Sequence, residues 1–322
     1  MKIYRSLTGI PADFGPSVLT IGNFDGVHFG HRRILKRVAE LARERGWKPS
    51  VLTFEPHPTR VVAPARAPKL LTSPMRRAEL MCEEGIEQVL ILPFTGEVAA
   101  LTPEEFVGQL VVDRLGAKAV LVGENFRFGH QQAGNVQVLA ALGQRLGFET
   151  EVVPIATCRG RLASSSGIRE AIQAGRVALA ARLLQHPYGI EGEVVKGHGV
   201  GAKQTVPTLN LATDAEVLPA RGVYLTRTWD TMSGRTWNSI TNIGYRPTFG
   251  DTEELSIETF LLEPLEGAPP RRIRVEFLCR VRDERKFATP EALKAQILRD
   301  VRVAQNYFRR ARSWVGRRLS RA

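Results

Sequence analysis

The chain has few of the residues on which several protein classes depend. Its 322 residues include only three cysteines, and Cys82, Cys158 and Cys279 stand far apart. An odd number of widely spaced cysteines predicts neither a disulfide framework nor a zinc knuckle, and it favours a reducing compartment. No apolar run approaches the roughly 18 residues of a membrane-spanning helix, and the opening MKIYRSLTGIPADFG lacks the apolar core of an export signal. We therefore expect a soluble, cytoplasmic protein with no membrane partner.

Aromatic residues are also scarce, at 7% of the chain, whereas Lys and Arg number 45 against 33 for Asp and Glu. The resulting charge of +12 will attract polyanions. A nucleic-acid-binding protein should carry clustered base-stacking aromatics or a known binding motif, and the sequence has neither. We interpret the arginines near the end of the chain as a solvated helix face. Small phosphate ligands are thus favoured over nucleic acid as partners.

The first half of the chain alternates short apolar runs with helical patterns. The runs are SVLTIGNF, PSVLTF, EQVLILPF, KAVLVG and ETEVVPI, and the helical patterns cover 34–42, 75–84, 103–115 and 136–146. Nearly continuous apolar strands between helices predict a doubly wound α/β domain with a parallel sheet, which we place at residues 1–185. Ligands of such a domain bind at the carboxyl ends of the strands.

The pattern changes near residue 186. From there the sequence predicts only strands, separated by Gly, Pro and Asp turns, until one long helix at about 290–315. The strand-like runs are IEGEVVK, VPTLNLA, GVYLTRTWD, RTWNSITNIG, LSIETFLLE and RRIRVEFLCRV. This spacing is typical of a small antiparallel β-barrel, here with a terminal helix, over residues 186–322.

The stretch GNFDGVHFGH joins the first of these strands to the first helix. We expect 22–26 to form a loop and His28 and His31, three residues apart, to share one helical face. Gly30 removes a side chain between them, and the free N–H groups of the helix N-terminus favour a phosphate. Two capping or partly buried histidines would explain the same residues. A zinc site is less well supported, because no third ligand is obvious.

Three further motifs fall at strand ends, where the fold predicts a ligand cleft. They are TFEPHP at 53–58, VGENFRFG at 122–129 and RGRLASSSGIREAI at 159–172. In the last motif, serines at a helix start offer hydroxyl and N–H groups to phosphates, and Arg161 and Arg169 supply positive charge. A plain N-cap is the common role of any single serine, but it explains three serines beside two arginines poorly.

The second half contains a glycine-rich stretch, GHGVGAKQ, followed by PTLN. No Walker loop occurs, but backbone amides of such glycines can wrap phosphates, with Lys203 nearby. Thr208 and Asn210, two apart on one strand face, offer oxygen ligands for Mg²⁺, although both residue types also form turns. Glu258 lies within the apolar run LSIETFLL, where a carboxylate has either a chemical role or a structural partner.

The joint order of the motifs in the first half resembles a known family. HxGH with SSSGIRE resembles the nucleotidylyltransferases, and GNFDGVHFGH, TFEPHP and ENFRFG resemble the FMN adenylyltransferase module of bacterial bifunctional riboflavin kinase/FAD synthetases. The resemblance implies that FMN attacks the α-phosphorus of ATP and releases pyrophosphate, with His28 and His31 as catalytic phosphate contacts. The implied ATP and phosphate contacts are Gly22, Phe24, Asp25, His28, His31, Asn125, Arg161, Ser164, Ser165 and Arg169.

The second half resembles the riboflavin kinase module over nearly its full length, from HPYGIEGEVVKG to LKAQILRDVRVAQNYF. The resemblance implies phosphoryl transfer from ATP to riboflavin, with Thr208 and Asn210 at Mg²⁺ and Glu258 as general base. The implied ATP contacts of this module are Gly197, Gly199, Gly201 and Lys203. Gln204, Thr205, Val206, Leu209 and Phe260 depart from the family pattern. We therefore expect an enzyme that makes FMN and then FAD, with an efficient adenylyltransferase site alone as the alternative.

Overall fold

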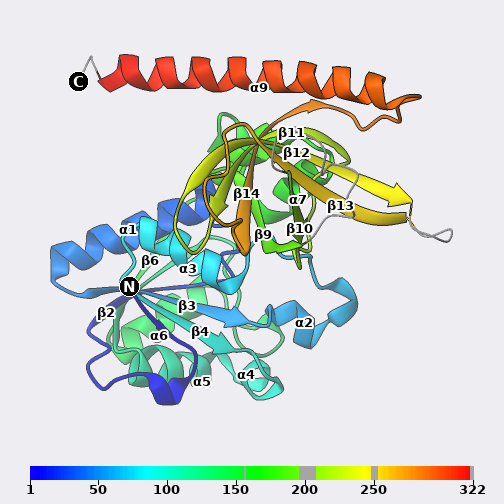
Figure 1. The fold of residues 1–322 in the computed structure, drawn as a ribbon. Coiled ribbons are helices and arrows are strands. Elements are labelled where there is room, and N and C mark those ends of the chain that lie inside the picture. Colours follow the sequence, from blue (N-terminus) through cyan, green and yellow to red (C-terminus); the bar gives the residue numbers. More distant parts are fainter. Residues whose placement is uncertain (156, 196–207, 248–252, 320–322) are drawn as a thin grey trace. The chain divides into compact units, whose positions relative to one another are not determined.

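The structure is a computed structural model that describes residues 1–155, 157–195, 208–247 and 253–319. Contacts between residues divide the chain into two compact units, Met1–Ser165 and Ser166–Ala322. Each unit contains its own principal sheet (Figure 1). Within the described ranges, no helix is long and apolar enough to cross a membrane.

The first unit is a parallel six-stranded sheet with helices on both faces, which confirms the predicted fold. The strands lie in the order β1-β4-β3-β2-β5-β6. They are β1 (Lys2–Tyr4), β2 (Ser17–Ile21), β3 (Lys48–Glu55), β4 (Gln88–Pro93), β5 (Ala117–Gly123) and β6 (Glu149–Val153). From β2 the chain winds outward through β3 and β4, then crosses to β5 and β6 on the other side. The strand order therefore reverses at β2, where open α/β sheets bind ligands beyond the carboxyl ends.

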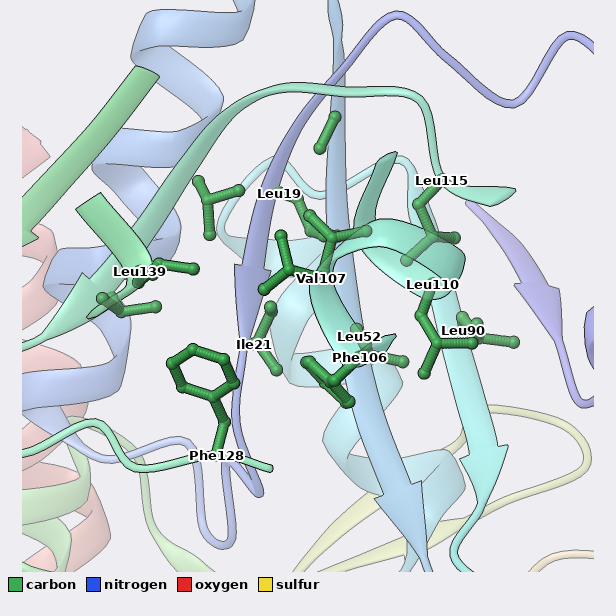
Figure 2. Close-up of a cluster of buried hydrophobic side chains, with 14 of the residues drawn as sticks. Leu19, Ile21, Leu52, Leu90, Phe106, Val107, Leu110, Leu115, Phe128 and Leu139 are labelled. Carbon is green, nitrogen blue, oxygen red and sulfur yellow. The ribbon is translucent and has the colours of Figure 1, made fainter. Parts of the chain in front are cut away.

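Helices α1 (Phe29–Arg45) and α3 (Pro74–Glu83) bury their apolar faces on one side of this sheet. Helix α6 (Val136–Leu146) and the helical segment Phe106–Arg114 cover the other side. Figure 2 shows this second core, in which side chains from both helical segments meet those of β2, β3 and β4. The shorter elements of the first unit are η1 (Leu7–Gly9), α2 (Pro58–Val62), η2 (Pro64–Arg66), α4 (Gly96–Ala100), α5 (Pro103–Glu105), η4 (His130–Gln132), β7 (Thr157–Cys158) and β8 (Arg161–Leu162).

The helix predicted over 103–115 differs from expectation in its winding. It begins with a capping box between Thr102 and Glu105 and continues as a π-helix, η3, over Phe106–Arg114. The buried residues are Phe106, Val107, Leu110, Val111 and Leu115. Phe106, Leu110 and Leu115 are four and five residues apart, which is wider than the α-helical repeat, so the wider winding keeps these three on the face toward the sheet.

The second unit is a closed antiparallel barrel with the strand order β10-β13-β12-β11-β14-β9, as the sequence predicted. Its elements are α7 (Ser165–Gln173), α8 (Val177–Leu184), β9 (Tyr188–Val195), β10 (Thr208–Ala212), β11 (Gly222–Asp230), β12 (Thr236–Pro247), β13 (Glu253–Leu261), β14 (Arg272–Arg282) and α9 (Pro290–Leu319). Ala304 and Phe308 of α9 pack in one apolar cluster with Val223, Leu225 and Ile240 on the outside of the barrel.

Hydroxyl side chains fill part of the barrel interior. Thr226 bonds Ser239 at 2.8 Å and Thr241 at 2.9 Å, and Thr241 bonds Thr259 at 2.9 Å. These four side chains are fully buried, so their hydroxyls satisfy one another where no water reaches. Because strand residues alternate in direction, the polar residues next to them in sequence face outward.

Candidate active sites

The loop after β2 is tightly folded and anchored through Asp25. Phe24 and Val27 have φ angles of 49° and 41°, in the left-handed region that non-glycine residues seldom adopt. The buried Asp25 carboxylate accepts hydrogen bonds from the amides of Leu71 (2.9 Å) and Thr72 (3.2 Å). Asp25 therefore positions the loop through the segment before α3, and such held strain is typical of binding sites.

The two histidines of the motif lie together at the start of α1. Their rings stack with centroids 3.7 Å apart, and the ring of Phe24 packs edge-on against His31 at 5.1 Å. A Cβ at Gly30 would lie 3.3 Å from Cε1 of His28, so a glycine here leaves room for the stack. His28 occupies the N-cap position of α1, yet its side chain makes no capping hydrogen bond. The capping explanation is therefore wrong for His28.

Both imidazoles are held in the neutral form. Burial lowers the pKa of His28 to about 4, although the nearby Asp25 charge partly opposes the shift. Burial also lowers the pKa of His31 well below its ordinary value, with further lowering by His28 and by the charge of Arg77. The Nδ1 atoms of both rings are buried and have no hydrogen-bond partner among the described residues. Two unpartnered nitrogens beside free helix N–H groups can serve an anionic ligand.

The serine motif meets this loop. Ser165, the first residue of α7, donates its hydroxyl to the backbone oxygen of Asp25 at 3.0 Å. Ser164 directly precedes it, and Arg161 is exposed on β8. Asn125 is exposed in the turn after β5, at the same edge of the sheet as the end of β2. The strand ends thus gather the motifs of the first unit, whereas Arg169 belongs to the second unit.

Two residues of the motif TFEPHP, His57 and Glu55, have different structural roles. His57 caps α2 by accepting a hydrogen bond from the amide of Thr59 at 3.3 Å. Glu55, at the end of β3, forms an ion pair with Arg77 of α3 at 3.1 Å. The other branch of that guanidinium donates to the backbone oxygen of Asn23 at 2.9 Å. Arg77 therefore links the ends of β2 and β3.

In the barrel, Asn210 and Glu258 are directly opposite each other on β10 and β13. Their sequence neighbours Leu209, Ile257 and Thr259 are buried, so both face outward, together with Thr208. An oxygen of Glu258 accepts a hydrogen bond from Ser256 at 3.1 Å. Closing the barrel thus brings an amide, a hydroxyl and a carboxylate, far apart in sequence, to one face.

Two more polar residues reach this face. Asn242 of β12 is the other register partner of Glu258. A Cβ at Gly244 would collide with Oε1 of Glu284 and would lie 3.3 Å from Nδ2 of Asn242.

Gly197, Gly199, Gly201 and Lys203 lie outside the described residues. Among the described residues, no group of three or more His, Cys, Asp or Glu side chains is arranged to hold a metal ion.

The comparisons with known proteins cover both units. A family model described as FAD synthetase matches residues 10–167, and one described as riboflavin kinase matches 184–308. The bifunctional riboflavin kinase/FMN adenylyltransferase of Pseudomonas fluorescens is 36% identical over 95% of this chain and 97% of its own length. The chain belongs to the bifunctional riboflavin kinase/FMN adenylyltransferase family. It is an enzyme with both domains, and these findings support the bifunctional interpretation rather than the alternative.

Another member of this family and one solved structure also match nearly the whole length of the chain. The protein of the same description from Escherichia coli (strain K12) is 36% identical over 96% of this chain and 98% of its own. A crystal structure described as a macrolide-efflux protein from Streptococcus pneumoniae is 27% identical, with a TM-score of 0.82 over 95% of this chain and 98% of its own. The two-unit architecture is therefore common to that protein and this family member.

Sequence reasoning missed Arg77, Thr72, Asn242 and Glu284. Arg77 could have been noticed, because it falls on the apolar face of its helix beside Ala78, Leu80 and Met81, all of them buried. A lone arginine on such a face needs a partner. Asn242 and Glu284 carried no comparable local signal, since only strand register and barrel closure place them.

Proposed function

We propose that the first unit transfers an adenylyl group from ATP to FMN at the carboxyl end of β2. An oxygen of the FMN phosphate attacks the α-phosphorus, the bond from that phosphorus to the β-phosphate oxygen breaks, and pyrophosphate leaves. His28 and His31 donate N–H groups to phosphate oxygens and so stabilise the charge that develops during transfer. Gly22, Asn125, Arg161, Ser164 and Ser165 would complete the phosphate and substrate contacts, while Phe24 and Asp25 support the loop. The stacked imidazoles, whose Nδ1 atoms have no hydrogen-bond partner within the described part of the chain, are the observation that carries this proposal.

The barrel would phosphorylate riboflavin to FMN with a separate ATP. Glu258 is the proposed general base that accepts the proton of the riboflavin hydroxyl. This role needs a carboxylate that a substrate from solvent can reach, and Glu258 is partly exposed. Thr208 and Asn210 beside it offer oxygen ligands, the donor type that Mg²⁺ prefers, so these residues fit the ion. When bound, Mg²⁺ would neutralise phosphate charge.

We further propose that the adenylyltransferase module spans 1–185 and the kinase module 186–322, and that the enzyme acts in the cytoplasm. The start of the riboflavin kinase match at residue 184 supports this boundary, whereas the two compact units of the fold divide earlier in the chain, between Ser165 and Ser166. Riboflavin, FMN and ATP are then its partners, without nucleic acid or membrane.

Substituting the histidines should separate the two activities. We expect His28→Ala with His31→Ala to lower FAD formation from FMN at least about 100-fold, because transition-state donors are lost. FMN formation from riboflavin should stay unchanged in this double variant. The control is His130→Ala, which replaces an exposed histidine of the same unit and should leave both FMN formation and FAD formation unchanged. Chromatographic assay of each flavin provides the measurement. Equal loss of both activities in a folded double variant would contradict separate sites.

Glu258→Gln should have the opposite effect. It keeps the size of the side chain but removes the base, so riboflavin phosphorylation should fall about 100-fold or more while added FMN is still converted to FAD. Glu266→Gln is the matched control, because Glu266 is an exposed carboxylate of the same unit. Full kinase activity in the Glu258 variant would refute the assignment.

A further inference from the structure

Arg77 is a charged side chain in an apolar setting. The side chain extends from α3, where Arg77 is only 1% exposed. It lies on the same buried helix face as Leu80 and Met81. An unpaired guanidinium in such a place would be strongly destabilising, so it is retained only where specific partners hold it. Arg76, its neighbour in sequence, instead pairs at the surface with Glu79 at 2.8 Å.

The partners of Arg77 come from two strand ends of the proposed adenylyl-transfer site. One branch of the guanidinium binds the Glu55 carboxylate at 3.1 Å, and the other donates to the Asn23 carbonyl at 2.9 Å. Its Nε is buried and has no hydrogen-bond partner among the described residues. A planar fork can make both bonds at once, which a lysine ammonium cannot do in the same geometry. The loop that carries the histidines is therefore fixed to β3 through one side chain.

The charge of Arg77 also acts on the histidine pair. The groups that face the imidazoles are His28 and His31 themselves, Asp25 and Arg77, and Glu55 balances the guanidinium. Asp25 favours protonation of His28, whereas Arg77 disfavours protonation of His31. The positive charge of Arg77 therefore acts on His31, while the His31 ring itself stays neutral.

We propose that Arg77 is a positioning residue for adenylyl transfer, which fixes the loop after β2 to β3 and keeps the HxGH imidazoles in their phosphate-binding arrangement. The proposal rests on the function proposed for this site. The residue acts through Asn23, Glu55 and His31, and its positive charge adds to the field that an ATP phosphate meets.

The test compares Arg77→Met, Arg77→Lys and the control Arg76→Met in the full chain. FAD formation from FMN is measured from about pH 3.5 to 9, so that the range extends below the His28 pKa of about 4, with riboflavin phosphorylation as an internal control. Arg77→Met should lower kcat for FAD formation about 10- to 100-fold, since a small displacement of catalytic groups has effects of that size. It should also move the acid limb of kcat/KM to higher pH, because His31 becomes easier to protonate.

Arg77→Lys retains the charge and should therefore restore the position of the acid limb while recovering only part of kcat. Arg76→Met should match the unaltered protein in both measurements. A normal rate in Arg77→Met, or a reduced rate with an unmoved acid limb, would overturn the proposal in favour of a purely structural role. If Arg77→Met fails to fold, an acid limb moved to higher pH in Arg77→Lys would overturn it equally. An unaltered protein that forms no FAD would refute the proposed function itself.

Discussion

The imidazoles of His28 and His31 carry no charge at pH 7, although they lie where phosphates are expected to bind. Burial is the main cause, and it outweighs the attraction of Asp25 for a proton on His28. A neutral ring still donates through one nitrogen, and it avoids the cost of a buried cation before ATP arrives. Free α1 amides and Arg77 then provide the positive potential of the site.

The depressed pKa of His28 predicts that the first unit loses stability in acid. The folded pKa of about 4 is below the ordinary 6.5, so the unfolded chain binds the proton first as the pH falls. Above pH 6.5 the neutral His28 ring costs the folded protein no stability. As the pH falls from 6.5 to 4, the free energy of unfolding decreases, and the decrease due to His28 reaches about 3 kcal/mol. Denaturant unfolding at several pH values measures it.

A double variant, His28→Gln with His31→Gln, isolates this effect from other titrating groups. Its unfolding free energy should fall less between pH 7 and 4.5 than that of the unaltered protein, because neither glutamine titrates. His130→Gln replaces an exposed histidine of the same unit and should leave the slope unchanged. Identical slopes for all three proteins would show that the buried rings do not couple folding to protonation.

At the scale of elements, glycine contacts in the helices give a second stability prediction. A Cβ at Gly143 of α6 would lie 2.7 Å from the backbone oxygen of Phe148, whereas one at Gly108 of η3 would meet nothing within 4 Å. Gly143→Ala should therefore lower the free energy of unfolding by about 1 to 3 kcal/mol. Gly108→Ala should leave it unchanged or raise it by up to about 1 kcal/mol. Calorimetry compares the pair, and equal Tm values would contradict the packing described.

The sequence was most informative about elements with a strong local pattern. Apolar runs predicted β2 to β6 and all six barrel strands, because burial on one or both faces leaves a repeat within a few residues. The three-residue β1 was missed, since so short an edge strand has no repeat to detect. The π-helical winding of η3 was also missed, because its capping box and first apolar residues are those of an α-helix.

The candidate sites were predictable in part for the same reason. His28 and His31 are three residues apart, so helix geometry alone brings them together. Arg77 reaches Asn23 across 54 residues and Glu55 across 22, a convergence that no local pattern encodes. The pairing of Asn210 with Glu258 likewise depends on barrel closure.

The whole molecule combines two units that each have a core and a candidate site of their own. The sheet of the first unit is closed by helices on both faces, and the barrel of the second is closed on itself. The product of the proposed kinase reaction, FMN, is the substrate of the proposed adenylyl transfer, so the two sites would act in sequence.

The most direct test of this account is a time course of the purified chain with riboflavin, ATP and Mg²⁺, in which riboflavin, FMN and FAD are separated and measured. The account predicts that FMN rises first and then declines as FAD accumulates. Omission of Mg²⁺ should abolish FMN formation, because Thr208 and Asn210, the proposed oxygen ligands, would then have no ion to hold against the ATP phosphates. Riboflavin that remains unchanged would contradict the kinase assignment, and FMN that never becomes FAD would contradict the adenylyltransferase assignment.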